Sequence, residues 1–145
     1  MTSKILAGSI VGLFVAVGTA RGFQQGPPIV LYSSQDSAGV VTEYRVTESK
    51  LAAVKPWFPE RERPPLSIAA AVATAKKRLR PQQAAGLVVI GIKISSVSSG
   101  GALRWYYRVE CYDSAQVYGD LPPETMEVLV LMDGSVVEPV RVGRG

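Results

Sequence analysis

The chain has 145 residues, of which 47% are hydrophobic and 19% charged, and this composition is that of a packed globular protein and excludes a largely disordered one. Its sixteen basic and twelve acidic residues give a net charge of +4, which is too small to predict a nucleic-acid partner. With one cysteine and no histidine, the sequence excludes an intrachain disulfide, histidine-based catalysis and most transition-metal sites.

The first 22 residues have the pattern of a secretory signal peptide. Lys4 supplies a positive charge, and the sixteen residues 5–20 that follow it carry none. The small residues Gly18, Ala20 and Gly22 suit cleavage after Ala20 or Gly22. An uncleaved membrane anchor is the alternative, but such a segment is short against the roughly 20 residues that span a bilayer. We therefore expect a secreted or periplasmic protein that meets the membrane only if this segment is retained.

Residues 23–63 are expected to form an extended segment that contains a hairpin and a proline-rich connector. The segments 29–32 and 40–46 read as strands around a stretch of turn-forming residues. Trp57 and Phe58 lie in the connector. We interpret them as a hydrophobic anchor onto the core, with a partner contact as the alternative.

The clearest helix is predicted for residues 67–80. Ser67 can accept hydrogen bonds from the first free amides, and Pro81 prevents continuation. The predicted apolar face of this helix consists of residues at helical spacing: Ile68, Val72, Ala75 and Leu79.

Two strands with alternating residues follow the helix. In the first, residues 87–97, one face is predicted to carry Val88, Ile90, Ile92 and Ile94. The second strand is predicted to point five residues inward: Leu103, Trp105, Tyr107, Val109 and Cys111. Its outward face is predicted to carry Arg104, Tyr106, Arg108, Glu110 and Tyr112.

The last two strands are expected to form a hairpin around Asp133-Gly134. A two-residue type I′ turn at this dipeptide places Met132 opposite Ser135 and Val130 opposite Val137. Pro139 predicts a sheet edge, because proline has no amide to donate. The expected fold is therefore α+β: residues 64–142 form one main helix packed on a four-stranded antiparallel sheet, after a signal peptide (1–22) and an extended segment (23–63).

Three segments, residues 65–75, 105–110 and 128–137, supply an Ala-rich helix, an aromatic strand and a hairpin turned by Asp and Gly. This order resembles the PepSY domain family, small modules found in propeptides of secreted metallopeptidases and in bacterial envelope proteins. The family is associated with inhibiting or chaperoning peptidases, so the resemblance implies a protein-binding module. The chain differs in having no HExxH motif, and its residues before 64 fall outside the resemblance.

We expect no enzymatic activity, no cofactor and no metal site. Glu60 and Glu62 lie among arginines in the connector, where charge neutralisation is the simpler interpretation of the pair. Asp113 and Asp120 flank a loop but lack the spacing of a calcium site. Cys111 alternates with apolar residues and is predicted to be buried and unreactive.

The candidate partner-binding residues lie on the predicted outward face of the aromatic strand: Arg104, Tyr106, Arg108 and Tyr112. Cations interleaved with aromatic rings can bind anions or proteins, although a solvated sheet face has the same pattern. Our first hypothesis is a non-catalytic module that binds a protein in the envelope or outside the cell. The second is an envelope module that binds an anionic polymer through this face, and the third is an enzyme of an unrecognised type.

The export hypothesis predicts the N-terminus of the mature protein. Protein recovered from the cells that make it should begin near Arg21 or Phe23, as measured by mass spectrometry of the intact chain. An intact Met1 in the cytosolic fraction would contradict the hypothesis.

Overall fold

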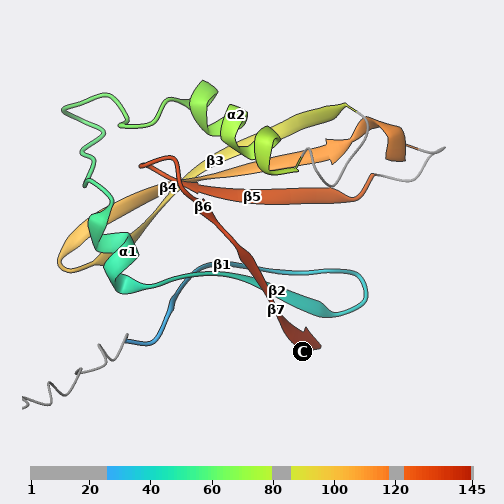
Figure 1. Cartoon of the computed structure of the whole chain (residues 1–145), viewed down its shortest axis with the longest axis horizontal. Helices are drawn as coiled ribbons and strands as arrows, with labels where there is room; N and C mark the ends of the chain where they lie inside the picture. Colours follow the sequence, from blue (N-terminus) through green and yellow to red (C-terminus); the bar gives the residue numbers. More distant parts are fainter. Residues whose placement is uncertain (1–25, 80–85, 118–122, 145) are drawn as a thin grey trace, which may run out of the picture.

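The computed structural model describes residues 26–79, 86–117 and 123–144, so the predicted signal peptide and the predicted helix end at Arg80 and Pro81 lie outside the described residues. Within these residues seven strands form two antiparallel sheets, with the orders β1-β2-β7 and β3-β4-β5-β6. Helix α2 covers the face of the four-stranded sheet that points away from the three-stranded sheet (Figure 1). The α+β class is confirmed, and the second sheet was not predicted.

The helices and strands have the following bounds. In chain order they are β1 (Ile29–Gln35), β2 (Val40–Val46), α1 (Glu48–Ala53), α2 (Ile68–Leu79), β3 (Leu87–Ser99), β4 (Ala102–Asp113), a 3₁₀ turn (Ser114–Gln116), β5 (Thr125–Leu131), β6 (Val136–Val137) and β7 (Pro139–Arg144).

The three-stranded sheet joins the beginning of the described chain to its end. Strands β1 and β2 form a hairpin in which the Asp36 carboxylate accepts hydrogen bonds from the amides of Ala38 (2.9 Å) and Val40 (2.8 Å). Strand β7 pairs antiparallel with β2, with Pro139 opposite Tyr44. The segment before residue 64 therefore shares a sheet with the last strand.

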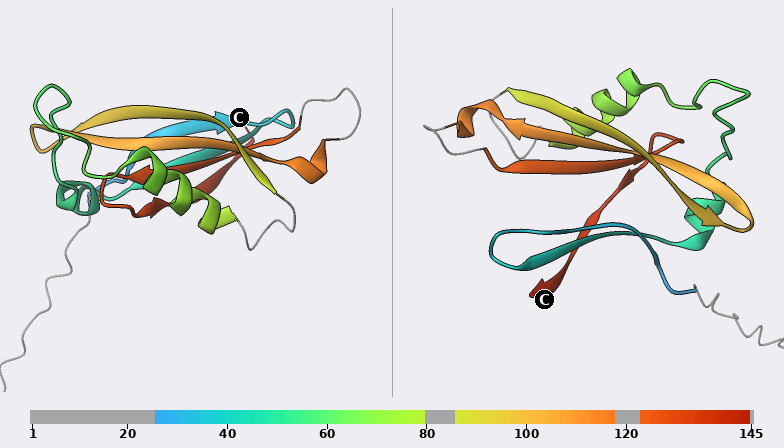
Figure 2. Two further views of the ribbon diagram at one scale, coloured as in Figure 1. Left: turned by 90° about the horizontal axis from the view of Figure 1, so that it is seen from above. Right: turned by 180° about the vertical axis from the view of Figure 1, so that it is seen from behind.

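The predicted final strand is in fact two strands in different sheets. Strand β6 pairs with β5, then Glu138 intervenes, and β7 starts at Pro139 in the other sheet. Figure 2 shows this ribbon descending from the upper sheet to the lower one. Pro139 thus marks the point where the strand leaves the four-stranded sheet, which its missing amide favours.

The predicted register of the last hairpin is wrong by one residue. Leu129 lies opposite Val137, and the Leu131 amide donates to the carbonyl of Ser135 (2.9 Å). The connection is a three-residue loop in which only Gly134 has positive φ (85°), because Asp133 keeps the negative φ of a type I turn. Val137 consequently shares the face of Leu129 and not that of Val130.

A bulge interrupts the predicted alternation in β3. The register shifts between Val89 and Gly91, so Ile90 has no directly opposite partner. Val88, opposite Tyr112, therefore faces the three-stranded sheet, while Ile92 and Ile94 share the α2 side. The prediction that all four apolar residues share one face is wrong.

Strand β4 is covered on both faces. Tyr107, Val109 and Cys111 are fully buried on the α2 side, as predicted. Leu103 is 51% exposed, because the helix does not reach it, so its predicted inward position is wrong. The prediction that the opposite face is exposed is also wrong, because Tyr106 is only 6% exposed beneath the second sheet.

Two side chains outside the sheets fix the connector and the helix. Trp57 is buried with its ring centroid 5.3 Å from that of Trp105, whereas Phe58 is exposed, so Trp57 alone anchors the connector. The Ser67 hydroxyl accepts from the Ala70 amide (3.2 Å) and caps α2 as predicted. Ile68 is 50% exposed, so its predicted place on the buried helix face is wrong.

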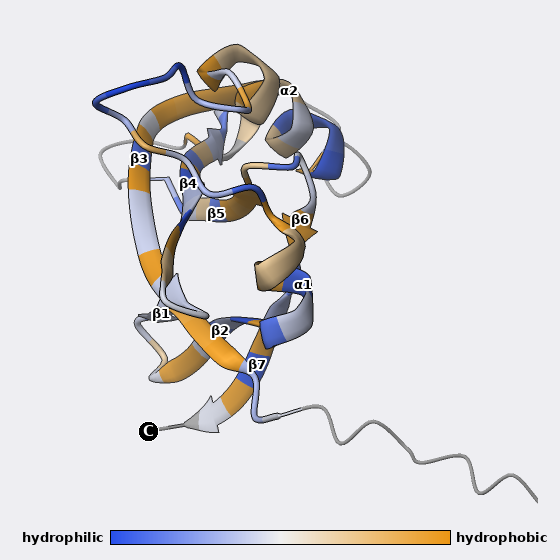
Figure 3. Cartoon of the chain, turned by 90° about the vertical axis from the view of Figure 1, so that its left-hand side faces the viewer, coloured by the Kyte–Doolittle hydropathy of each residue, from blue (hydrophilic) through white to orange (hydrophobic). Residues whose placement is uncertain are grey.

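Helix α1 lies at one end of the two sheets, beside the lower one, as Figures 1 and 3 show. Thr47 caps it by accepting from the Lys50 amide (3.3 Å), and Leu51 and Val54 are fully buried. Helix α1 and the residue after it therefore contribute apolar side chains to the core at this end.

Leu129 tests the burial between the sheets. Leu129→Ala should lower the free energy of unfolding by about 3 kcal/mol, because it opens a cavity at a fully buried position. Ile68→Ala should cost less than about 1 kcal/mol, because Ile68 is half exposed. Denaturant unfolding of both variants measures the difference, and equal losses would contradict the described burial.

Candidate binding cleft between the sheets

Two tyrosine hydroxyls cross between the sheets in opposite directions. Tyr44 of β2 donates to the backbone carbonyl of Glu127 on β5 (2.8 Å). Tyr106 of β4 donates to the backbone carbonyl of Leu31 on β1 (2.7 Å). Each bond pairs two polar groups that would otherwise be buried without a partner, so together they fix the spacing of the sheets.

An ionic cluster lies beside these bonds. The Arg108 guanidinium is 3.2 Å from the carboxylate of Glu110 and 3.6 Å from that of Glu127, and it stacks 4.1 Å from the ring centroid of Tyr32. Lys93 adds a second cation to Glu110 at 3.0 Å. The two half-buried carboxylates are therefore neutralised from β4 and β3 while Tyr32 reaches them from the other sheet.

The tyrosines of this cluster keep their protons to high pH. Burial raises the pKa of Tyr44 to about 12, with the negative charge of Glu127 as the second cause. The pKa of Tyr32 is also raised, first by burial and then by its hydrogen bond to the Glu127 carboxylate. Both hydroxyls therefore act as hydrogen-bond donors at neutral pH.

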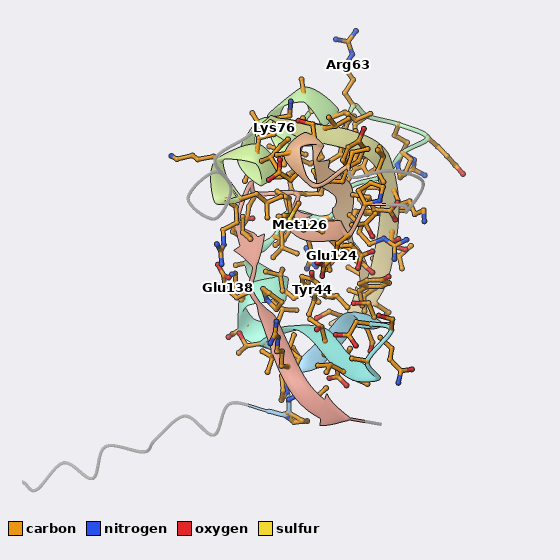
Figure 4. The ribbon with its side chains drawn as sticks, turned by 90° about the vertical axis from the view of Figure 1, so that its right-hand side faces the viewer. Tyr44, Arg63, Lys76, Glu124, Met126 and Glu138 are labelled. Atoms are coloured by element: carbon orange, nitrogen blue, oxygen red, sulfur yellow. The ribbon has the colours of Figure 1, made fainter. Side chains whose placement is uncertain are left out.

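A cleft with a volume of about 1080 Å³ opens next to this cluster, at the end of the sheets away from α1. The three-stranded sheet lines it with Ser34, Thr42 and Arg141, which the strand registers place in one row. Glu124 and Thr125 line it from the start of β5, and Leu79 lines it from the end of α2. Figure 4 labels two of the lining residues, Tyr44 and Glu124.

Polar residues make up part of the cleft lining at this end, beside apolar residues of β5, β6 and the end of α2. Ser34, Thr42 and Arg141 face a row in which Tyr112 lies opposite Thr125. Short hydroxyl side chains and an exposed guanidinium do not close against each other as the apolar residues beside α1 do, because their polar atoms keep contact with water. Arg141 and Glu124, neither of which takes part in an ion pair within the described residues, carry opposite charges on the two walls.

The structure places the four predicted binding residues on one face of β4, as expected, but inside the molecule. Arg104 donates to the backbone carbonyl of Val54, and Tyr106 bonds to β1. The Arg108 side chain is 15% exposed, and Tyr112 is half buried at the cleft end of the strand. The aromatic and cationic side chains that we expected on a solvated face instead contact the second sheet and the residue after α1.

Sequence reasoning missed the residues that the second sheet contributes to the cleft. Tyr32 and Ser34 on β1, and Thr42 and Tyr44 on β2, alternate with the outer residues of their strands. That alternation is a signal of a half-buried sheet, but nothing in the residues before 64 shows which part of the chain they face. Glu124 and Arg141 are separated by an entire hairpin, and only the pairing of β7 with β2 brings Arg141 to the cleft.

The other candidate sites have structural partners. Glu62 pairs with Lys55 (3.6 Å), and the Asp113 carboxylate accepts from the Ala115 amide (3.0 Å) at the 3₁₀ turn, while Asp120 lies outside the described residues. Cys111 is buried as predicted, and burial raises the pKa of its thiol, with nearby Lys76 acting in the opposite direction. Among residues 26–79, 86–117 and 123–144, no group of acidic, cysteine or histidine side chains could hold a metal ion.

Comparisons with known families, with characterised proteins and with solved structures give no match. The resemblance to the PepSY family therefore stays a prediction. In the part of the chain that the structure describes, neither helix is long and apolar enough to cross a membrane.

Replacement of Arg108 measures how much the ionic cluster contributes to the stability of the fold. Arg108→Met should lower the free energy of unfolding by about 2–3 kcal/mol, because Glu110 and Glu127 lose a cation at half-buried positions. Arg45→Met, which breaks a more exposed pair with Glu43, should cost less than about 1 kcal/mol. Denaturant unfolding checks both values, and adding Glu127→Gln to Arg108→Met should recover part of the loss.

The raised pKa of Tyr44 predicts a loss of stability at alkaline pH. The unfolded chain releases this proton near pH 10 and the folded chain near pH 12, so the stabilisation is complete below pH 10 and is lost as the pH rises toward 12. The slope should approach about 1.4 kcal/mol per pH unit for this group. Tyr44→Phe should flatten the curve between these pH values, and an unchanged slope in chemical denaturation would show that Tyr44 does not contribute.

Proposed function

We propose that this chain is a secreted or periplasmic, non-catalytic module that binds an extended segment of another protein in the cleft between its two sheets. The observation that carries the proposal is the cleft itself. The cleft combines hydroxyl groups with two opposite charges that have no ion-pair partners among the described residues. It is also bordered by β7, an edge strand of the three-stranded sheet.

The size and border of the cleft favour an extended peptide. A volume of about 1080 Å³ lies at the upper end for ligand pockets and accommodates several residues of a chain. Pro139 and Arg141 of β7 line it, and β7 is the terminal strand of its sheet. A segment lying along β7 could add main-chain hydrogen bonds to the unpaired side of that strand, which is a common mode of peptide recognition.

The charges of the walls favour a peptide over a ligand of one sign. Arg141 would attract a carboxylate and Glu124 an amine or a guanidinium, and a polypeptide presents both kinds of group. Ser34 and Thr42 supply hydroxyls that can donate to or accept from its backbone. The resemblance to the PepSY family supports the same class of partner, since that family acts on peptidases by binding.

Two polar groups of the cleft lining support binding in place of catalysis. The Glu127 carboxylate pairs with Arg108, and the Tyr44 hydroxyl already donates to a backbone carbonyl. Binding of an anionic polymer, the second hypothesis, would require the β4 face to be open. No observation favours it, because Tyr106 and Arg108 on that face lie between the sheets.

Charge reversal at the cleft tests the proposal. Affinity capture from the envelope fraction of the cells that export the protein should recover the same partner with the unchanged protein and with Arg61→Glu, an exposed control that does not line the cleft. Arg141→Glu should lose that partner, by a factor of about 10 or more in affinity for one lost charged contact. Retention of the partner by Arg141→Glu would contradict the proposed site. Steep loss of binding by the unchanged protein with added salt would instead favour an anionic polymer.

A further inference from the structure

The outer edge of β3 has no strand beside it within the described residues. Strand β3 is thirteen residues long and stands at the end of the four-stranded sheet. Edge strands of a sheet present unpaired amides and carbonyls, and natural proteins usually protect these edges with charges, prolines or bulges.

The hairpin between β3 and β4 determines which groups point to the open edge. Gly100 (φ 58°) and Gly101 (φ 75°) make a two-residue turn between Ser99 and Ala102, which are opposite each other. Such flanking residues form a hydrogen-bonded pair, and the pairs alternate along an antiparallel ladder. This alternation turns the amides and carbonyls of four residues toward the open edge: Ile92, Ile94, Ser96 and Ser98.

The two halves of β3 differ in their protection. The first half carries the bulge at Ile90 and the charge of Lys93. Residues 94–99 carry no charge, no proline and no register shift, and four of the six are serines whose small side chains allow another strand to approach. On the α2 side of this half, Ile94 is 42% exposed and Leu103 is 51% exposed.

We propose that a second copy of this chain pairs antiparallel with the β3 edge, with the two-fold axis at Ser95, so that two four-stranded sheets become one. The edge is self-complementary in this register. Ile94 lies opposite Ser96 of the other copy and Ile92 opposite Ser98, so all four outward residues form main-chain hydrogen bonds. The neighbouring registers form fewer of these hydrogen bonds. An axis at Ser96 would place Ile92 opposite the turn, and an axis at Ile94 would place Ser98 opposite the bulge, so in each case one outward residue would lose its regular partner.

The single charge of the strand selects the same register. With the axis at Ser95, each Lys93 lies opposite Val97 of the other copy, and the two lysines are about 14 Å apart along the ladder, beyond the screening length of about 10 Å. An axis at Lys93 would place the two ammonium groups directly opposite each other, which is unfavourable. The same pairing covers the exposed side chain of Ile94 from both copies.

The oligomeric state and its response to an edge charge test the pairing. Sedimentation equilibrium should find a dimer for the unchanged protein, and Ile94→Lys should raise the dissociation constant by about 100-fold or more by adding a like charge near the axis. Val30→Lys, on the terminal strand β1 of the other sheet, should leave the dimer intact. A monomer for the unchanged protein at high micromolar concentration, or a dimer for Ile94→Lys, would overturn the proposal.

A disulfide at the axis tests the register in a protein with the native edge. Two Ser95 residues would form a non-hydrogen-bonded pair with Cα atoms about 4.5 Å apart, within the range that a disulfide bridges. Ser95→Cys should therefore form a covalent dimer under mild oxidation, while Ser49→Cys on α1 should not, and native Cys111 is buried and does not compete. Absence of the covalent dimer would overturn the register. Arg141→Glu should leave the dimer unchanged, because Arg141 lines the cleft and is not on the β3 edge. The experiments therefore test the dimer and the peptide-binding cleft independently.

Discussion

Burial of β4 on both faces is the constraint on which the rest of the structure depends. A strand with aromatic and cationic residues on one face and apolar residues on the other is costly to enclose unless its polar groups find partners. Among the described residues, only Arg104 Nε and Trp105 Nε1 of this strand are buried without one. Tyr106 bonds to β1, Arg104 to the residue after α1, and Tyr107 to the carbonyl of Leu66 (2.8 Å) in the connector. Backbone carbonyls from three other segments thus converge on one strand, and this convergence orders the layers.

The two ends of the sandwich differ because this arrangement is asymmetric. Beside α1 the core is closed, because Leu51 and Val54 are fully buried and the Arg104 guanidinium donates to the Val54 carbonyl. At the other end the facing rows contain hydroxyls and two charges that have no ion-pair partner among the described residues. These polar groups remain in contact with water, and a cleft lies there. The Arg108 cluster lies between the two regions and supports both, since it spaces the sheets and contributes Tyr32 and Glu127 to the cleft lining.

Sequence patterns predicted the local secondary structure better than they predicted how the two sheets pack on each other. The Ser67 cap, the helix, the order of β3 to β5 and the burial of Cys111 depend on neighbours along the chain and were predicted correctly. The facing of β4 was predicted wrongly, because period-2 alternation separates two faces without showing whether a second sheet covers the more polar one. The hairpin register failed because Asp-Gly suits both a two-residue turn and a three-residue loop, and the difference of one residue exchanges the faces. Arg141 and Glu124 were missed because the switch of sheets at Pro139 has no local signature beyond the proline.

The pairing of β2 with β7 sets an order of assembly. During synthesis the β1–β2 hairpin emerges early, while the strand that completes its sheet emerges about a hundred residues later. A chain whose second and last strands must pair has a high contact order and folds slowly, because the long loop between them is closed before the pairing stabilises it. Until β7 arrives, the edge of β2 is available to any passing strand, which is a hazard for aggregation. A nascent chain of this design therefore benefits from a holding chaperone until its last strand is in place.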